Sequence, residues 1–118
     1  MSSITNDLVI NELVNYLDDK ASNALEEIIL YGSRARGDFR EHSDYDFLIV
    51  YKDLEDIDRI QDIVLDAEVL VMDRYEKLAS SLIWSISDWE RKKKYPLGLN
   101  ILKEGKHLWN KKNLLFPV

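Results

Sequence analysis

The sequence predicts an α/β fold in which a small mixed β-sheet is flanked by helices. Two apolar, β-prone runs, residues 27–31 and 45–51, are separated by a polar loop with two glycines. Segments whose apolar residues recur three or four positions apart surround these runs, and this spacing is typical of helices that pack on a sheet. The chain has 118 residues and 46% hydrophobic content. We therefore expect a single domain over residues 1–118.

The first half of the chain predicts one helix and two strands. Thr5 or Asn6 is the expected cap of the helix, since either side chain can accept from a free amide of the first turn. The apolar positions of this helix are Leu8, Leu13, Val14 and Leu17. Residues 27–31 predict a strand that ends at Gly32, and residues 32–43 predict a loop with room for one helical turn. Residues 45–51 have a continuous apolar centre, which predicts a strand covered on both faces.

The second half predicts alternating helices and strands. Pro96 should end a helix, because proline lacks the amide hydrogen that a helix interior requires. Gly105 should end another helix in the same region. In chain order, the expected elements are a helix over residues 53–65, a strand over 68–72, a helix over 74–95, a short helix up to Gly105 and an edge strand over 106–109.

Composition excludes several classes of function. The chain contains no cysteine, which rules out disulfides, thiol nucleophiles and zinc sites built from cysteine. Its formal net charge is -6, so direct binding of nucleic acid is not expected. No segment approaches the roughly 18–20 consecutive apolar residues of a membrane span, and the N-terminus does not read as a signal peptide. We expect a cytoplasmic protein without membrane association.

Acidic residues at the start of the second expected strand indicate a metal site. Asp44 and Asp46 should point to the same side, about 6.5 Å apart, because side chains on a strand alternate. Two like charges at the start of an apolar strand need compensation, which a pair of divalent cations about 3.5–4 Å apart would supply. Glu68 opens the expected strand 68–72 and is the candidate third ligand. Asp66 is the alternative, and Glu68 could also be a solvated acid.

The loop between the two expected strands has residues suited to binding the triphosphate of a nucleotide. Gly32 lets backbone amides approach a ligand closely, and Ser33 adds a hydroxyl at the start of the expected helical turn. Arg34 is the preferred candidate for binding phosphate oxygens through its guanidinium group. Arg36 is the weaker candidate, because it could equally pair with Asp38 or Glu41. The implied reaction is an in-line displacement at the α-phosphorus, with pyrophosphate leaving, and it requires no side-chain nucleophile.

Two segments carry a resemblance to a known family. The run GSRARG at residues 32–37, followed by SDYDFLIV at residues 43–50, resembles the polymerase-β-like nucleotidyltransferase superfamily. Within it, the sequence looks most like the minimal nucleotidyltransferases of prokaryotes, the MNT proteins. The resemblance implies that Asp44, Asp46 and Glu68 bind two Mg²⁺ ions and that ATP is a substrate. Asp46 or Glu68 is our hypothesis for the base that deprotonates the acceptor hydroxyl, because both are expected to lie near the attacking oxygen.

The resemblance also implies a partner and a substrate. It implies an antitoxin of a toxin–antitoxin pair that transfers AMP from ATP to a tyrosine of a HEPN-domain toxin, with which it forms a hetero-oligomer. Two alternatives stay open from the sequence. One is a nucleotidyltransferase for a small molecule, with a self-dimer closing the acceptor pocket. The other is a non-catalytic antitoxin that neutralises its partner by contact.

Overall fold

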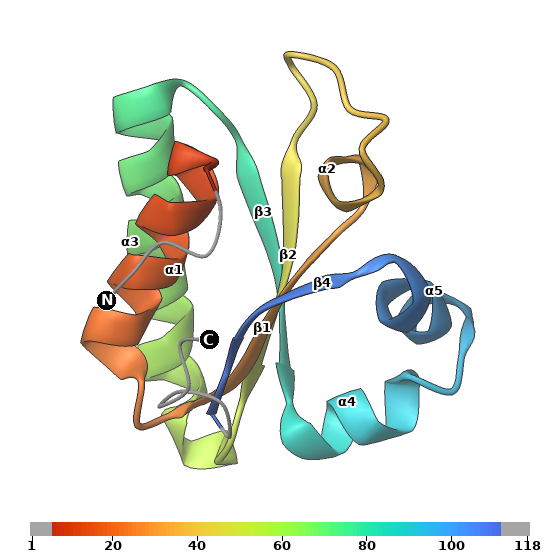
Figure 1. The fold of residues 1–118 in the computed structure, drawn as a ribbon. Helices are drawn as coiled ribbons and strands as arrows, with labels where there is room; N and C mark the ends of the chain where they lie inside the picture. The colour runs from red at the N-terminus through yellow and green to blue at the C-terminus, as the bar shows by residue number, and fades with distance from the viewer. Residues whose placement is uncertain (1–5, 112–118) are drawn as a thin grey trace.

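The computed structural model describes residues 6–111 and has an α/β architecture (Figure 1). In chain order, its elements are α1 (Leu8–Ala21), β1 (Leu25–Tyr31), α2 (Ser33–Arg36), β2 (Tyr45–Tyr51), the 3₁₀ turn η1 (Leu54–Asp56), α3 (Ile57–Tyr75), β3 (Ala79–Ser85), α4 (Ile86–Lys92), α5 (Pro96–Glu104) and β4 (Lys106–Asn110). The predicted strand 45–51 is confirmed, and so is the helical turn within the loop 32–43. The extent of the domain over residues 1–118 stays a prediction.

The four strands form one mixed sheet in the order β3-β2-β1-β4. β1 pairs antiparallel with both β2 and β4, whereas β2 and β3 run parallel. Parallel neighbours need a long connection, and here α3 provides it between β2 and β3. The predicted mixed sheet and α/β fold are confirmed, and β4 is the predicted edge strand.

Helices cover both faces of the sheet (Figure 1). α1 and α3 pack on one face, where they share a core with the odd-numbered residues of β2, such as Phe47 and Ile49. α4 and α5 pack on the other face, where Trp89 and Ile101 join the even-numbered Leu48 and Val50. Because side chains alternate along β2, odd-numbered residues point to one face of the sheet and even-numbered residues to the other. Within residues 6–111, none of these helices has the length and apolar character that crossing a membrane requires.

The N-terminal cap of α1 differs from the prediction. The side chain of Asp7 accepts hydrogen bonds from the amides of Val9 at 2.9 Å and Ile10 at 3.2 Å. Asn6 precedes this cap, and Thr5 lies outside the described residues. Asp7 is a good cap because its carboxylate satisfies amides that have no partner inside the helix.

The predicted strand over residues 68–72 is wrong, because these residues belong to α3. The helix continues to Tyr75 because its buried residues keep helical spacing past residue 65. Those buried residues are Ile60, Val64, Ala67 and Val71. The chain then reverses at Glu76, which has a left-handed conformation with φ of 56°. The third strand of the sheet begins only at Ala79.

The predicted helix over residues 74–95 is correct only in part. Residues 79–85 form β3, and helix α4 follows over residues 86–92. The side chain of Ser85 caps α4 by accepting from the amide of Asp88 at 3.1 Å. Pro96 is the first residue of α5, where a missing amide hydrogen costs nothing. Gly105 ends α5 as predicted, and its amide donates to the carbonyl of Ile101.

Candidate active site

Asp44 and Asp46 lie together at the start of β2. Tyr45 between them is buried in the core beneath α1 and α3, so Asp46 points to the opposite face, which α4 and α5 cover. Asp46 is half-buried and Asp44 is exposed. Burial raises the pKa of Asp46, the negative charge of Asp44 raises it further, and Arg36 partly offsets both effects. The two carboxylates therefore form an electrostatically unfavourable pair that a cation would relieve.

Gly32 approaches the carboxylate of Asp46 more closely than any other residue type could. Its φ is +76°, and a Cβ built on it would lie 2.5 Å from Oδ2 of Asp46. Its carbonyl accepts from the amides of Ala35 and Arg36, both at 3.0 Å, and these bonds close the short helix α2. Gly32 and Ser33 thus stand at the N-terminus of α2 beside the acidic pair. Their predicted contact with a triphosphate stays a prediction.

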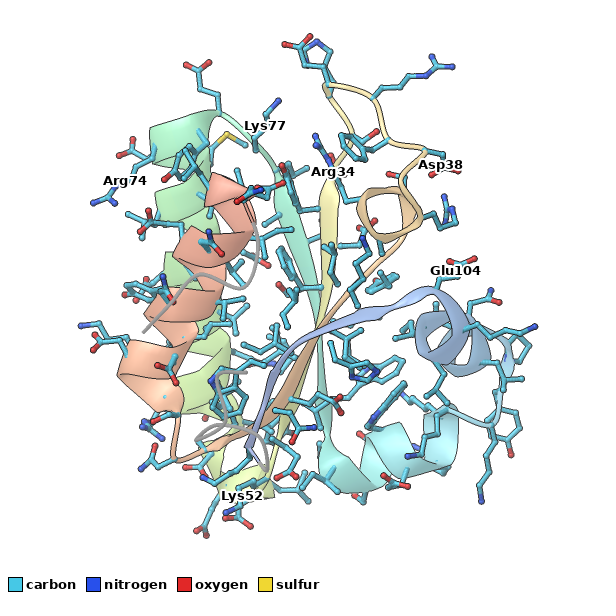
Figure 2. The ribbon with its side chains drawn as sticks, viewed as in Figure 1. Arg34, Asp38, Lys52, Arg74, Lys77 and Glu104 are labelled. Carbon is cyan, nitrogen blue, oxygen red and sulfur yellow. The ribbon has the colours of Figure 1, made fainter. Side chains whose placement is uncertain are left out.

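Arg34 holds the loop between α2 and β2 through hydrogen bonds and ring contacts (Figure 2). Its Nη2 donates to the carbonyls of Ser43 at 3.0 Å and Glu41 at 3.1 Å, and its Nε also faces Ser43 at 3.3 Å. The guanidinium carbon lies 4.3 Å from the ring centroid of Phe39 and 4.2 Å from that of Tyr45. Two of its nitrogens, Nε and Nη2, therefore already donate hydrogen bonds to the loop. Its predicted role toward a nucleotide stays a prediction.

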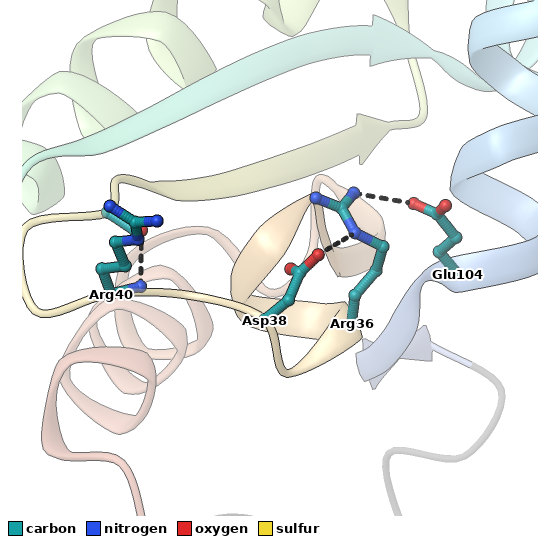
Figure 3. Close-up of polar contacts among 5 residues, drawn as sticks. Arg36, Asp38, Arg40 and Glu104 are labelled. Carbon is teal, nitrogen blue, oxygen red and sulfur yellow. Dashed lines mark hydrogen bonds and ion pairs between the residues drawn. The ribbon is translucent and has the colours of Figure 1, made fainter.

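Arg36 links the same loop to helix α5 (Figure 3). Its Nε pairs with Asp38 at 3.2 Å, and its Nη1 pairs with Glu104 at 3.2 Å. Pairing with Asp38 was one of the possibilities that the sequence left open. Pairing with Glu104 was not predicted, because no local pattern connects residues 68 positions apart in the chain. The contact places the C-terminal end of α5 next to the acidic pair.

Two tyrosines near the site were missed by sequence reasoning. Tyr31 is the cross-strand partner of Asp46. Burial raises the pKa of Tyr31, and the charge of Asp46 adds to the effect. Its position directly before Gly32, at the end of a strand, was the available signal. On the other face, the hydroxyl of Tyr45 donates to Oδ2 of Asp7 at 2.9 Å, which ties β2 to the start of α1.

Glu68 does not join Asp44 and Asp46. It lies on α3, on the opposite face of the sheet, beside Ser81. Burial raises the pKa of its carboxyl, and the neighbouring Ser81 offsets only part of this effect. Asp66, the alternative ligand, is exposed on the same helix. Among residues 6–111, no three His, Asp or Glu side chains are grouped so that they could hold one metal ion. The prediction of Glu68 as third ligand depended on the wrong strand assignment.

The residues that do meet suit one hard cation together with a phosphate ligand. Mg²⁺ is commonly held in proteins by one or two carboxylates, with substrate phosphates and water completing its coordination. Asp44 and Asp46 supply the carboxylates, and Gly32 lets the backbone at the start of α2 approach the carboxylate of Asp46 closely. The donor set therefore fits Mg²⁺. It lacks the third carboxylate on which the prediction of two ions depended.

Comparisons with known proteins relate this chain to one family of enzymes. The family described as polymerase beta, nucleotidyltransferase matches residues 11–114. A protein of Methanocaldococcus jannaschii, named as an inferred protein adenylyltransferase, is 35% identical over 100 residues, which cover 85% of this chain and 94% of the relative.

Solved structures show the same fold. A chain of a toxin–antitoxin crystal structure with AMP-PNP has a TM-score of 0.58 and 21% identity, covering 86% of this chain and 73% of the other. A chain from the complex of a tri-AMPylated HEPN toxin of Shewanella oneidensis with an MNT antitoxin has a TM-score of 0.53 and 17% identity, covering 90% and 73%. At these identities the likeness is one of fold.

Proposed function

Since this chain belongs to the polymerase beta nucleotidyltransferase family, we propose that it transfers AMP from ATP to a hydroxyl of a partner protein, with pyrophosphate as the leaving group. The proposed acceptor is a tyrosine of a HEPN-domain toxin, and the chain acts as the antitoxin of the pair. The relative named as an inferred protein adenylyltransferase, 35% identical to this chain, supports a protein acceptor. The shared fold with chains from toxin–antitoxin complexes supports the kind of partner.

One observation carries the proposal: the carboxylate of Asp46 lies against the backbone of Gly32 and within electrostatic range of Asp44. A Cβ at Gly32 would lie 2.5 Å from Oδ2 of Asp46, so glycine is the residue that lets the backbone lie this close to the carboxylate. Burial of Asp46 is unfavourable for stability, because the charged carboxylate gives up solvent next to Asp44. A binding site for a cation and a phosphate chain explains why this arrangement is present.

The proposed roles follow from where each residue lies. Asp44 and Asp46 would hold Mg²⁺, which when bound neutralises phosphate charge and orients the triphosphate. Gly32 and Ser33 would contact the phosphates at the start of α2, and Arg34 would fix the loop that frames them. Asp46 is half-buried beside Asp44, and it is the proposed acceptor of the hydroxyl proton. These residues supply positioning and charge complementarity, and none becomes covalently modified.

An exposed apolar surface on α5 supports a protein partner. We define the α5 surface as Tyr95, Leu99 and Leu102, which recur three or four residues apart on one face and are between 43% and 60% exposed. Contiguous exposed apolar residues of this kind mark sites of protein association. Glu104, at the end of the same helix, pairs with Arg36 beside the acidic pair. A protein bound to the α5 surface would therefore lie next to the proposed site.

Neutralisation by contact alone is the second candidate. The observation that favours it is the absence of a third carboxylate beside Asp44 and Asp46 within residues 6–111. In that case the α5 surface would carry the function, and substitution of Asp46 would leave toxin inhibition intact.

The direct test is transfer from α-labelled ATP to the co-expressed partner, with labelled GTP, CTP and UTP in parallel. The proposal expects label on a partner tyrosine from ATP and none from Asp46→Asn. A partner that is inhibited without label would support contact neutralisation. Label that persists in Asp46→Asn would contradict the assigned site.

A further inference from the structure

The strand position beside Asp46 is occupied by Ser80. β2 and β3 are parallel, and their register pairs Asp46 with Ser80. Further along β3, Leu82 and Trp84 pack on the cluster beneath α4 and α5. Because side chains alternate along a strand, Ser80 points to this face as well. Ser80 is exposed, so its hydroxyl lies at the open end of the sheet next to the acidic pair.

Glu68 of α3 lies on the other side of the same strand. Ala79 and Ile83 of β3 belong to the core beneath α1 and α3. Ser81 lies two residues from each of them along the strand, so its side chain faces the same core. Glu68 lies beside Ser81. The sheet itself therefore separates Glu68 from Asp46. Ser80, not Glu68, holds the position from which β3 could contribute a ligand.

We propose that this chain has a cation site of two carboxylates and one hydroxyl, formed by Asp44, Asp46 and Ser80, and that it holds a single divalent cation. The proposal rests on the proposed function and specifies its metal chemistry. Two carboxylates carry two negative charges, which match one divalent cation, whereas a second cation would need charge from the nucleotide. Binding of the cation to the free protein is accordingly weak, and the phosphates of a bound nucleotide strengthen it.

The test is titration of the free protein with Mn²⁺, followed by electron paramagnetic resonance of unbound Mn²⁺, without nucleotide or partner. The expected stoichiometry for wild type is no more than one ion per chain. Ser80→Asp should tighten Mn²⁺ binding by about tenfold or more, because a third carboxylate joins the site. Ser80→Asn has the size of the aspartate variant without its charge and should not tighten Mn²⁺ binding, whereas Ser80→Ala removes the hydroxyl ligand and should weaken it; unchanged binding in Ser80→Ala would overturn the role of the hydroxyl. Ser80 is exposed, so these variants are expected to fold, which circular dichroism verifies.

Two further variants separate this inference from the proposed function. Glu68→Gln should leave Mn²⁺ binding unchanged, and a loss as large as that in Asp46→Asn would overturn the inference. An affinity of folded Ser80→Asp equal to that of wild type would also overturn it. Binding of Mn²⁺-ATP that is unaffected by Asp46→Asn would instead refute the site on which the proposed function depends.

Discussion

The backbone of Gly32 and the carboxylate of Asp46 are in such close proximity that a Cβ on Gly32 would lie 2.5 Å from Oδ2 of Asp46. Gly32 also combines a φ of 76° with a ψ of -160°, a region that is essentially restricted to glycine. The sharp turn from β1 into α2 and the approach to the acidic pair therefore depend on the same residue.

Gly32→Ala should abolish AMP transfer and nucleotide binding, because the added methyl group displaces Asp46 or the loop. Gly37→Ala is the matched control. Gly37 also has a positive φ, of 92°, but nothing lies within 4 Å of a Cβ built there. Both variants lose stability through backbone strain, by about 1–2 kcal/mol at the left-handed Gly37 and by about 1–3 kcal/mol at Gly32. Equal nucleotide affinity of the two variants, measured by calorimetry, would show that the contact with Asp46 is unimportant.

Arg34→Lys should loosen the loop of residues 37–44. A lysine ammonium cannot reproduce the fork that donates to the carbonyls of Glu41 and Ser43, nor the stacking on Phe39 and Tyr45. Hydrogen exchange of the loop amides should become faster by about tenfold, the equivalent of roughly 1.4 kcal/mol of local opening free energy. Arg40→Lys changes an exposed residue of the same loop and serves as the control. Unchanged exchange in Arg34→Lys would argue that the loop is held by other contacts.

The hydrogen bond between Tyr45 and Asp7 predicts a dependence of stability on high pH. Burial, and then the contact with Asp7, raise the pKa of Tyr45 to about 12 from 10.0. A raised folded-state pKa stabilises the protein fully below the unfolded value, and this stability is lost as pH rises from about 10 to about 12. Tyr45→Phe has no hydroxyl to ionise and therefore lacks this pH-dependent stabilisation. The difference in free energy of unfolding between wild type and Tyr45→Phe, from urea titrations, should therefore shrink between pH 8 and pH 11, and a constant difference would contradict the prediction.

The contact between Trp109 and Asp18 fixes the edge strand β4 to α1. Nε1 of the buried Trp109 donates to Oδ1 of Asp18 at 2.9 Å. Asp18→Ala leaves this donor without its partner and should lower the free energy of unfolding by about 1–3 kcal/mol. Asp19→Ala, next to it in α1, removes a carboxylate that is 77% exposed and should have little effect. A similar loss in both variants would show that the indole hydrogen bond contributes nothing specific.

The α5 surface should be required for association with the partner. Leu99→Asp places a charge on that surface, where Leu99 is 45% exposed, so the fold is expected to tolerate it. Leu65→Asp is the control, since Leu65 is 57% exposed but lies on α3, on the other side of the sheet. Size-exclusion chromatography with the co-expressed partner should show loss of the complex for Leu99→Asp only. An intact complex would place the interface elsewhere.

The fold was predictable where the local pattern and the tertiary environment agree. The strand 45–51 is apolar throughout and is buried on both faces, so its bounds follow directly from the sequence. The error at residues 68–72 arose because Glu68-Val-Leu-Val-Met is β-prone as a short run. The spacing of Ile60, Val64, Ala67 and Val71 was the longer-range signal that α3 continues through it.

The candidate site was predictable in its local part only. Asp44, Asp46 and Gly32 belong to one contiguous segment, and the structure brings them together. The contributions of Ser80 and Glu104 depend on how β3 and α5 pack against that segment. Neither contact has a signal in local sequence, because sheet register and helix packing set them.

The most direct test of the central claim is transfer of labelled AMP from ATP, with Mg²⁺, to the protein encoded beside this chain and co-expressed with it. Wild type should label a tyrosine of the partner, and the double variant Asp44→Ala/Asp46→Ala should not, while still forming the complex through the α5 surface. A stable, inhibited complex that carries no label with wild type would contradict an enzymatic function and establish neutralisation by contact.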